Sequence, residues 1–417
     1  MTWYQDGRLH FGVGVEDTFV PQTRPGERAL DEYELTEHYE HWHADLGLAA
    51  EVGAEFMRWG VPWYRINPAP GQWDWSWLDP VMARFAELGI RPIVDLLHYG
   101  TPEWLEGEFA HPDYPQRVAE YAVAVAERYA DTVTDYTPVN EPMIHARFCG
   151  ELAYWPPYLR GEEGLIRMVA ALADGFSRSQ HGIAEALGER AAFWHVDATT
   201  RFVGDVDGEH ADKVRLLREQ VYVVEDLVTG RVDAAHPLTE HLLRHGFPED
   251  LLDRLRAAPA LPDVMGVNYY PKHSTTLVQA GPWPTGGFVE PQPTRDDGVV
   301  GLEEVLRSYA SRYGAPVALT ETCVTASEAE RVAWLDDSVA LLQRLRAEGM
   351  PVVAYTWWPL FDMYEWTYRH AGTPREASLL SMGLWDLVES DHGLLRRRNT
   401  VADAFAQHTA SDRVVTG

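Results

Sequence analysis

Residues 316–356 read PVALTETCVTASEAERVAWLDDSVALLQRLRAEGMPVVAYT, with a short apolar run on each side of a longer amphipathic segment. The runs Pro316–Thr320 and Val352–Thr356 are mostly apolar, as expected of strands that are covered on both faces. Ser327 and Glu330 have the spacing of a capping box, which predicts that a helix begins between the two runs. The stretch is therefore typical of a strand–helix–strand unit in a parallel sheet.

The same alternation recurs along the rest of the chain. Six further apolar runs are strand candidates, namely Leu9–Val15, Glu55–Trp59, Arg91–Leu97, Val133–Val139, Ala192–Val196 and Asp263–Val267. Apolar residues at helical spacing mark Thr36–Val52 and the segment that Pro115 opens. Because eight candidate strands alternate with helices, we expect an α/β fold in which residues 1–417 form a single (β/α)8 TIM barrel, with loop insertions at its C-terminal face.

The pair Gly12-Val13-Gly14 is the feature that best suits an open, dinucleotide-binding sheet. It lacks the third glycine of that motif, and no capped helix follows at once, so this alternative is disfavoured. The most loop-like stretches are Arg24–Leu30, Ala280–Gly298 and Tyr368–Ser378. We expect them to be loops on one body and not linkers between domains.

The chain is strongly acidic. It has 35 Lys and Arg residues against 64 Asp and Glu residues, so its formal net charge is −29. A field of that sign repels nucleic acid and anionic membranes, and we expect neither as a partner. No run of about 18 apolar residues is present, so no membrane span is expected either.

Cysteine usage indicates a reducing compartment. Cys149 and Cys323 are the only cysteines, which is too few for a disulfide framework. Met1–Val15 has no continuous apolar region of the kind that a secretory signal contains. We therefore expect a cytoplasmic protein. A single bridge between the two cysteines and assembly into a homo-oligomer both stay open.

Polar and aromatic side chains follow the predicted strands directly. In a (β/α)8 barrel, functional residues gather where strands end and the next loops begin. The residues at those positions are His98, Asn140-Glu141, Asn268-Tyr269-Tyr270, Glu321 and Trp357-Trp358. Carboxylates exchange protons or attack an anomeric carbon, polar groups bind hydroxyls, and indole faces pack on the apolar face of a sugar. The set therefore favours carbohydrate chemistry.

Six motifs carry a resemblance to glycoside hydrolase family 1, the β-glucosidase family. They are Phe56-Met-Arg-Trp59, Leu97-His-Tyr-Gly-Thr-Pro102, Thr137-Pro-Val-Asn-Glu-Pro142, Gly266-Val-Asn-Tyr-Tyr270, Leu319-Thr-Glu-Thr322 and Trp358-Pro-Leu-Phe-Asp-Met-Tyr-Glu-Trp366. In turn they resemble A-Y-R-F, L-Y-H-W-D-L-P, T-x-N-E-P, G-I-N-Y-Y, T/I-T-E-N-G and W-S-L-L-D-N-F-E-W, in the order of the family. The resemblance implies a retaining β-glycosidase that acts on a small-molecule glycoside by double displacement, without a cofactor or metal.

The resemblance also implies the roles of the reacting groups. Glu141 would protonate the glycosidic oxygen and then, as carboxylate, activate a water molecule. Glu321 would attack the anomeric carbon and form a glycosyl-enzyme. Arg58 and Tyr270 would flank Glu321 and keep it ionised, because a guanidinium favours the charged carboxylate. Arg58 as a purely structural ion-pair partner is the alternative.

The same resemblance implies a set of sugar contacts. Asn140 would hold the 2-hydroxyl, His98 and Glu365 would bind other ring hydroxyls, and Trp358 and Trp366 would form a stacking wall. His98 as a core histidine stays open, and so does a loop-capping role for Glu365 and Trp366.

The first strand departs from the family pattern W-G-x-A-T-x-x-Y-Q-x-E-G. The stretch Phe11–Phe19 reads FGVGVEDTF, which aligns Phe19 with the family glutamine, while a small shift offers Glu16 or Asp17. The sequence therefore gives no basis for predicting a preference for glucose. An acidic residue at this position would suit an amino sugar. The region after the eighth strand has no lysine-rich phosphate grip, so phosphorylated sugars are disfavoured.

Other features have competing interpretations. Trp73-Asp-Trp-Ser-Trp77 either contacts an aglycone or fastens its loop to the barrel. The histidines of Thr36–Val52 and the His241/His245 pair share helix faces but lack an HExxH context, so we expect packing or surface roles and no metal. A catalytically silent sugar-binding barrel, and a deglycosylating or transglycosylating enzyme of specialised metabolism, are the alternative functions.

Overall fold

The computed structural model describes residues 2–204, 207–208, 211–278 and 293–415, so most of the predicted loop Ala280–Gly298 lies outside the described residues. Each of the eight predicted strands is present, and together they close into one parallel barrel in the order β1-β12-β11-β9-β7-β6-β5-β4. The barrel strands are β1 (His10–Gly14), β4 (Phe56–Gly60), β5 (Arg91–Asp95), β6 (Asp135–Thr137), β7 (Ala192–Ala198), β9 (Val264–Asn268), β11 (Val317–Thr322) and β12 (Val352–Trp357). The predicted (β/α)8 fold is confirmed.

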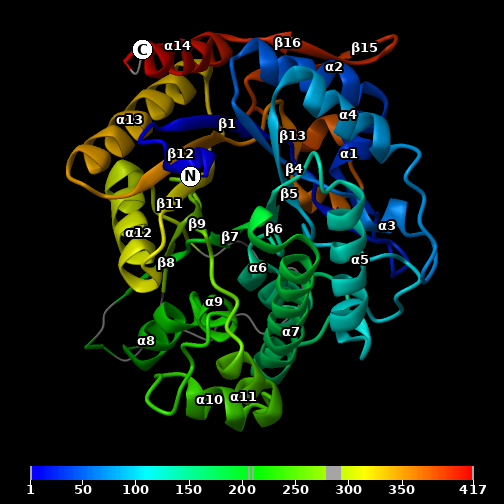
Figure 1. The fold of residues 1–417 in the computed structure, drawn as a ribbon, viewed down its shortest axis with the longest axis vertical. Coiled ribbons are helices and arrows are strands. Elements are labelled where there is room, and N and C mark those ends of the chain that lie inside the picture. The colour runs from blue at the N-terminus through cyan, green and yellow to red at the C-terminus, as the bar shows by residue number, and fades with distance from the viewer. Residues whose placement is uncertain (1, 205–206, 209–210, 279–292, 416–417) are drawn as a thin grey trace.

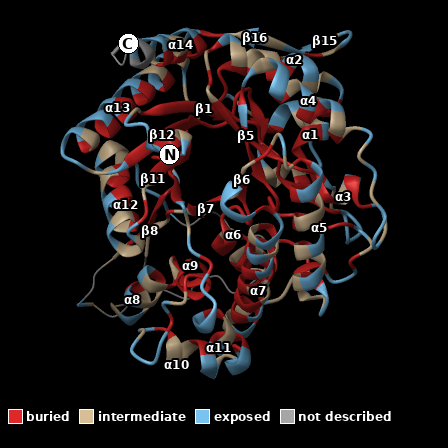
Figure 2. Ribbon diagram, viewed as in Figure 1, coloured by how far each residue is buried: buried red, intermediate tan, exposed pale blue. Residues whose placement is uncertain are grey.

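Helices surround the barrel, and their outer faces are exposed while the strands at the centre are buried (Figures 1 and 2). The longer ones are α2 (His38–Glu51), α4 (Leu78–Leu88), α5 (Tyr114–Arg128), α7 (Gly161–Leu187), α12 (Gly298–Tyr313), α13 (Glu328–Ala347) and α14 (Thr400–Val415). The predicted capping box begins α13, with Ser327 and Glu330 each accepting from the backbone N–H of the other. None of the helices within the described ranges is long and apolar enough to cross a bilayer.

Shorter elements fill the connections. The helices are α1 (Glu32–Leu35), α3 (Trp63–Ile66), α6 (Pro142–Ala146), α8 (Ala211–Gln220), α9 (Val223–Val228), α10 (Thr239–Arg244) and α11 (Glu249–Ala257). Four small sheets pair β2 (Phe19–Val20) with β3 (Leu30–Asp31), β8 (Arg201–Val203) with β10 (Thr275–Leu277), β13 (Met363–Tyr364) with β14 (Leu379–Leu380), and β15 (Trp385–Ser390) with β16 (Gly393–Arg398). Two of these sheets line the cavity at the barrel mouth, β8–β10 through Phe202 and Thr276 and β13–β14 through Met363 and Leu380.

Two predicted strands end earlier than their apolar runs. The run to Leu97 ends as β5 at Asp95, and the run to Val139 is a strand only over β6. The ladder resumes beyond β6, where the N–H of Asn140 donates to the Leu97 carbonyl (2.9 Å) and the N–H of Glu141 to that of Val196 (3.0 Å). The chain thus leaves strand geometry and returns to it at the mouth, which sets the direction of the Asn140 and Glu141 side chains.

The first-strand glycines serve close packing. A Cβ on Gly12 would come within 2.3 Å of the Phe56 ring, and one on Gly14 within 2.0 Å of the Trp358 indole. The missing side chains let those aromatic rings lie across β1. This is a different use of glycine from a phosphate-binding loop.

The tryptophan-rich stretch fastens its loop to the barrel. The Trp77 indole N–H donates to the Tyr39 carbonyl (3.1 Å), and its ring stacks on Trp59 with centroids 5.7 Å apart. The described residues that line the cavity at the barrel mouth include no tryptophan of residues 73–77. The stretch therefore fastens its loop to the barrel and does not border the space in which an aglycone would lie.

Candidate active site

A cavity of about 510 Å³ opens at the C-terminal ends of the barrel strands. Its inner part is lined by Glu16, His98, Tyr99, Glu141, Tyr270 and Glu321. A larger hollow of about 700 Å³ lies around Arg8 and Arg91 at the opposite end of the barrel, and the residues that line it include neither predicted glutamate. The chemistry expected from the sequence therefore converges on the smaller cavity.

Glu321 lies at the end of β11 and is 4% exposed. Its Oε1 is 2.7 Å from Arg58 Nη1, and its Oε2 accepts from the Tyr270 hydroxyl at 2.6 Å. Arg58 is fully buried and also bonds Asp95 at 2.6 Å, which fixes the guanidinium beneath the cavity. The two predicted flanking groups thus both contact Glu321.

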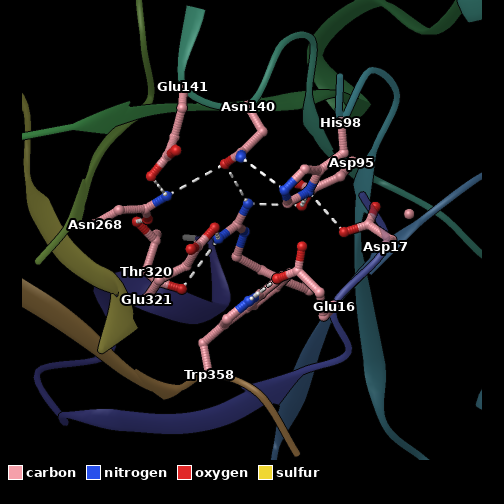
Figure 3. A network of polar contacts seen from close by, with 12 residues as sticks. Glu16, Asp17, Asp95, His98, Asn140, Glu141, Asn268, Thr320, Glu321 and Trp358 are labelled. Atoms are coloured by element: carbon pink, nitrogen blue, oxygen red, sulfur yellow. Dashed lines mark hydrogen bonds and ion pairs between the residues drawn. The ribbon is translucent and has the colours of Figure 1, made fainter. Parts of the chain in front are cut away.

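Glu141 follows β6 and approaches from the other side of the cavity (Figure 3). Its backbone is left-handed, with φ 45° and ψ 58°, and its side chain is almost fully buried. The Asn268 amide donates to its Oε1 at 2.9 Å, and the Tyr99 hydroxyl donates to its Oε2. This carboxyl is therefore bound by neutral donors, whereas Glu321 is bound by a cation.

The electrostatics of the two carboxyls are coupled. Burial raises the pKa of each above its ordinary value, and the negative charge of Glu141 raises that of Glu321 further. Two nearby carboxylates do not both ionise readily, so the pair holds a proton to higher pH than an exposed glutamate does. The positive charge of Arg58 opposes the rise in the pKa of Glu321.

Asn140 lies beneath the cavity, with no exposed surface. Its Oδ1 accepts from Arg58 Nη2 at 2.9 Å and from the Asn268 amide at 3.3 Å, and its Nδ2 is 3.1 Å from His98 Nε2 (Figure 3). Asn140 thus links the groups around both glutamates. The predicted contact with a sugar 2-hydroxyl stays a prediction.

His98 lines the cavity and is held from behind by Asp17. Its Nδ1 lies 2.6 Å from Asp17 Oδ1, and although burial alone would lower the pKa of His98, the Asp17 charge and contact raise it well above its usual value. Asp17, Asp95 and His98 bring three potential metal-ligating atoms within 4.8 Å of one another. The Arg58 guanidinium already bonds Asp95, so these groups form a hydrogen-bonded ion-pair network around an internal cation.

The structure separates the three candidates for the family glutamine. Glu16 lines the cavity and accepts from the Trp358 indole N–H at 2.8 Å. Asp17 supports His98, and Phe19 lies outside the cavity, stacked on Tyr64. The ungapped alignment with Phe19 therefore does not describe the cavity wall, because Glu16 and not Phe19 lines the cavity.

The predicted stacking residues occupy different depths. Trp358 is fully buried and stacks on His98, with centroids 5.7 Å apart, so its ring lies below the cavity. Trp366 lines the cavity wall and Glu365 is exposed at the rim. Only Trp366 of the two tryptophans borders the space that a ligand would fill.

The outer part of the cavity is mostly apolar. Its wall includes Ile144, Phe148, Leu152, Tyr154, Phe202 and Met363. Cys149 and Cys323 are free, buried thiols and are absent from the described lining of the cavity. Both thiols therefore pack away from the cavity, and the structure has no bridge between them.

Two residues at the centre of the site, Asn268 and Tyr99, were not assigned a function from the sequence. Asn268 stands at the end of a predicted strand and bonds Glu141, so its position was a usable signal. Tyr99 comes directly after His98, but its contact with Glu141 depends on a backbone φ of 77°, which the sequence pattern does not indicate.

Known proteins resemble this chain throughout the barrel. The family model for glycosyl hydrolase family 1 matches residues 2–186. A bifunctional β-D-glucosidase/β-D-fucosidase of Bifidobacterium breve is 26% identical over 385 residues, which cover 80% of this chain and 81% of that protein. The thermostable β-glucosidase B of Thermobispora bispora is 34% identical over 156 residues, which cover 34% of this chain and 31% of that protein.

Solved structures show the same fold. The family 1 β-glucosidase of Thermotoga maritima superposes with a TM-score of 0.80 at 20% identity, over 97% of this chain and 98% of that chain. The fold, the matched family model and the relatives aligned over four fifths of the chain agree with one another. The chain is therefore similar to glycosyl hydrolase family 1 in its matched family model, in its relatives and in its fold.

Proposed function

We propose that the protein is a retaining β-glycosidase in which Glu321 is the nucleophile and Glu141 is the acid/base. One observation carries the assignment of roles. Both carboxyls face one cavity, but Glu321 contacts the Arg58 guanidinium while Glu141 contacts the neutral donors Asn268 and Tyr99. A carboxylate beside a cation is suited to attack, and a carboxyl beside neutral donors is suited to exchange a proton.

In the first step, a Glu321 oxygen forms a bond to the anomeric carbon while the bond from that carbon to the aglycone oxygen breaks. The proton of Glu141 moves to the leaving oxygen, so the aglycone departs as a neutral alcohol. The products of this step are a glycosyl ester on Glu321 and an ionised Glu141. Arg58 and Tyr270 keep the attacking carboxylate charged and oriented.

In the second step, a water oxygen bonds to the anomeric carbon and the ester bond to Glu321 breaks. The ionised Glu141 takes the proton of that water, which restores both carboxyls to their starting states. The second inversion returns the original configuration. Transfer to an acceptor alcohol in place of water follows the same path, so hydrolysis and transglycosylation share the first step.

A fluorinated mechanism-based glycoside tests the proposal directly. We expect the intact mass to rise by the mass of one fluoroglycosyl group, with the label on the peptide that contains Glu321. The Glu321→Gln variant is the matched control and should stay unlabelled. If a panel of such glycosides binds but never adds mass, the protein is a sugar-binding barrel and the proposal is wrong.

The apolar outer wall leads us to propose an apolar aglycone. Phe148→Ala should lower kcat/KM for an aryl β-glycoside about tenfold, because a buried phenylalanine contributes about 1.5–3 kcal/mol of apolar contact. A glycosyl fluoride has no aglycone to fill this space and should react equally well with both proteins. Equal losses on the two substrates would mean that Phe148 supports the fold and not the aglycone.

Glu16 leads us to propose a glycone that carries an amino group. Glu16, Glu141, Glu321 and Glu365 place four carboxyls on the cavity wall. Glu16→Gln keeps an oxygen acceptor for Trp358 but removes the charge, so we expect about a tenfold fall in kcat/KM for an amino-sugar glycoside relative to its neutral counterpart. A wild-type enzyme that prefers plain glucosides exclusively would contradict this assignment.

The proposed location is a reducing cytoplasm. The two free, buried cysteines support it, because neither forms a disulfide in the structure.

A further inference from the structure

Tyr99 sits where the family motif L-Y-H-W-D-L-P has tryptophan, so this chain has a phenol where the motif has an indole. Its backbone φ is 77°, a conformation that an aromatic residue rarely adopts. The ring packs against His98 and His145, each with centroids 4.6 Å away, and against Trp155 and Trp366. Tertiary packing therefore holds Tyr99 in an unusual conformation that directs its hydroxyl into the site.

The hydroxyl of Tyr99 contacts the carboxyl of Glu141. It donates to Oε2, while the Asn268 amide donates to Oε1 at 2.9 Å. The Asn268 amide is itself oriented, because its Oδ1 accepts from Thr320 Oγ1 at 2.7 Å. Both oxygens of Glu141 thus have a fixed donor, one that follows β5 and one at the end of β9.

We propose that Tyr99 is a positioning residue for the acid/base: its phenol fixes the rotation of the Glu141 carboxyl and favours the ionised form that accepts a proton from water in the second step. The inference rests on the proposed function for its catalytic meaning. The contact itself is a property of the folded chain and can be tested without turnover.

The phenol can act only as a donor while it keeps its own proton. Burial and the charges of Glu141 and Glu321 raise the pKa of Tyr99 well above its usual value, so the phenol stays protonated at ordinary pH. A donor to a carboxylate stabilises the charged form and lowers its pKa. The Tyr99 contact therefore opposes the burial that raises the pKa of Glu141.

The other groups that act on Glu141 do not include a second phenol donor among the described residues. Burial raises the pKa of Glu141, and the hydrogen bonds from Tyr99 and Asn268 are the largest effects that lower it. The positive charges of His98 and Arg58 lower it further. Glu321, Tyr270 and Asp197 interact electrostatically with Glu141. His145, which burial keeps neutral, packs behind Tyr99. Removing the Tyr99 hydroxyl leaves these charges in place.

Tyr99→Phe is the direct test, with the glutamate carboxyl carbons labelled with carbon-13 and Glu141 assigned through Glu141→Gln. We expect the pKa of Glu141 to rise by about one unit, since a hydrogen bond to a charged group is lost. The basic limb of the kcat/KM profile should move upward by the same amount, because Glu141 keeps its proton to higher pH. Hydrolysis of the glycosyl-enzyme should slow by about tenfold at pH values below the pKa of Glu141, because less of Glu141 is ionised there.

Tyr136→Phe is the matched control, because Tyr136 is a buried phenol of β6 that bonds only the Val133 carbonyl among the hydrogen bonds of the described chain. It should leave the Glu141 titration unchanged. A second measurement needs no variant: in wild-type protein labelled at the tyrosine ζ-carbon, the Tyr99 signal should shift with the same midpoint as Glu141.

Two results would overturn the inference. One is an unchanged Glu141 titration in Tyr99→Phe, whether or not the melting temperature falls, and the other is a Tyr99 signal that ignores the titration of Glu141. If the titration shifts as expected but no glycoside is turned over, the contact stands and the proposed function fails. The two failures are therefore distinguishable.

Discussion

Glu321→Ala is expected to abolish turnover of every β-glycoside, with a loss of roughly 10⁵-fold or more, the scale seen when an enzyme loses its nucleophile. Glu321 contacts Arg58 and Tyr270, and its removal leaves those groups with no carboxylate to orient. Initial rates with an activated aryl glycoside measure the loss. Glu185→Gln, an exposed change on α7, is the control and should react like the wild type.

Added azide identifies the role of Glu321 independently of the rate. In Glu321→Ala, azide can enter the space of the lost carboxylate and displace the aglycone in one inversion, which gives the α-glycosyl azide from a β-glycoside. Product analysis by NMR distinguishes the two configurations. Normal turnover by Glu321→Ala, or a β-glycosyl azide as its product, would remove Glu321 from the role of nucleophile.

Glu141→Ala is expected to separate substrates by their leaving groups. Glycosides with poor leaving groups need protonation in the first step, and we expect them to lose roughly 10³-fold, within the range that general acid catalysis contributes. Substrates with good leaving groups need little protonation, so their first step should continue and the glycosyl-enzyme should accumulate. Rates for a series of aryl glycosides, with a burst of released aglycone, measure this difference.

Azide again provides the complementary result. Here it attacks the glycosyl-enzyme on the face where Glu141 normally activates water, so the product is the β-glycosyl azide. A loss that is the same for every leaving group would contradict the acid/base assignment. It would place Glu141 among the groups that bind the sugar in both steps.

The sequence alone determined the barrel and the positions of the two glutamates within it. Short apolar runs and the capping box at Ser327 are local signals, and they predicted strands that the structure confirms. Because parallel barrel strands all end on one face, placing Glu141 and Glu321 after strands was enough to predict that both would reach the same mouth. The cavity contains both residues.

Only the tertiary structure decided which side chains line the cavity and which lie beneath it. Glu16, and not Phe19, faces the cavity, through a contact with Trp358 that spans 342 positions in the chain. Trp358 and Asn140 are buried below the cavity, while Tyr99 reaches Glu141 from a left-handed backbone conformation. The physical reason is that the chain leaves strand geometry at the mouth, where the direction of a side chain depends on the packing of distant loops and no longer on the period of the sequence.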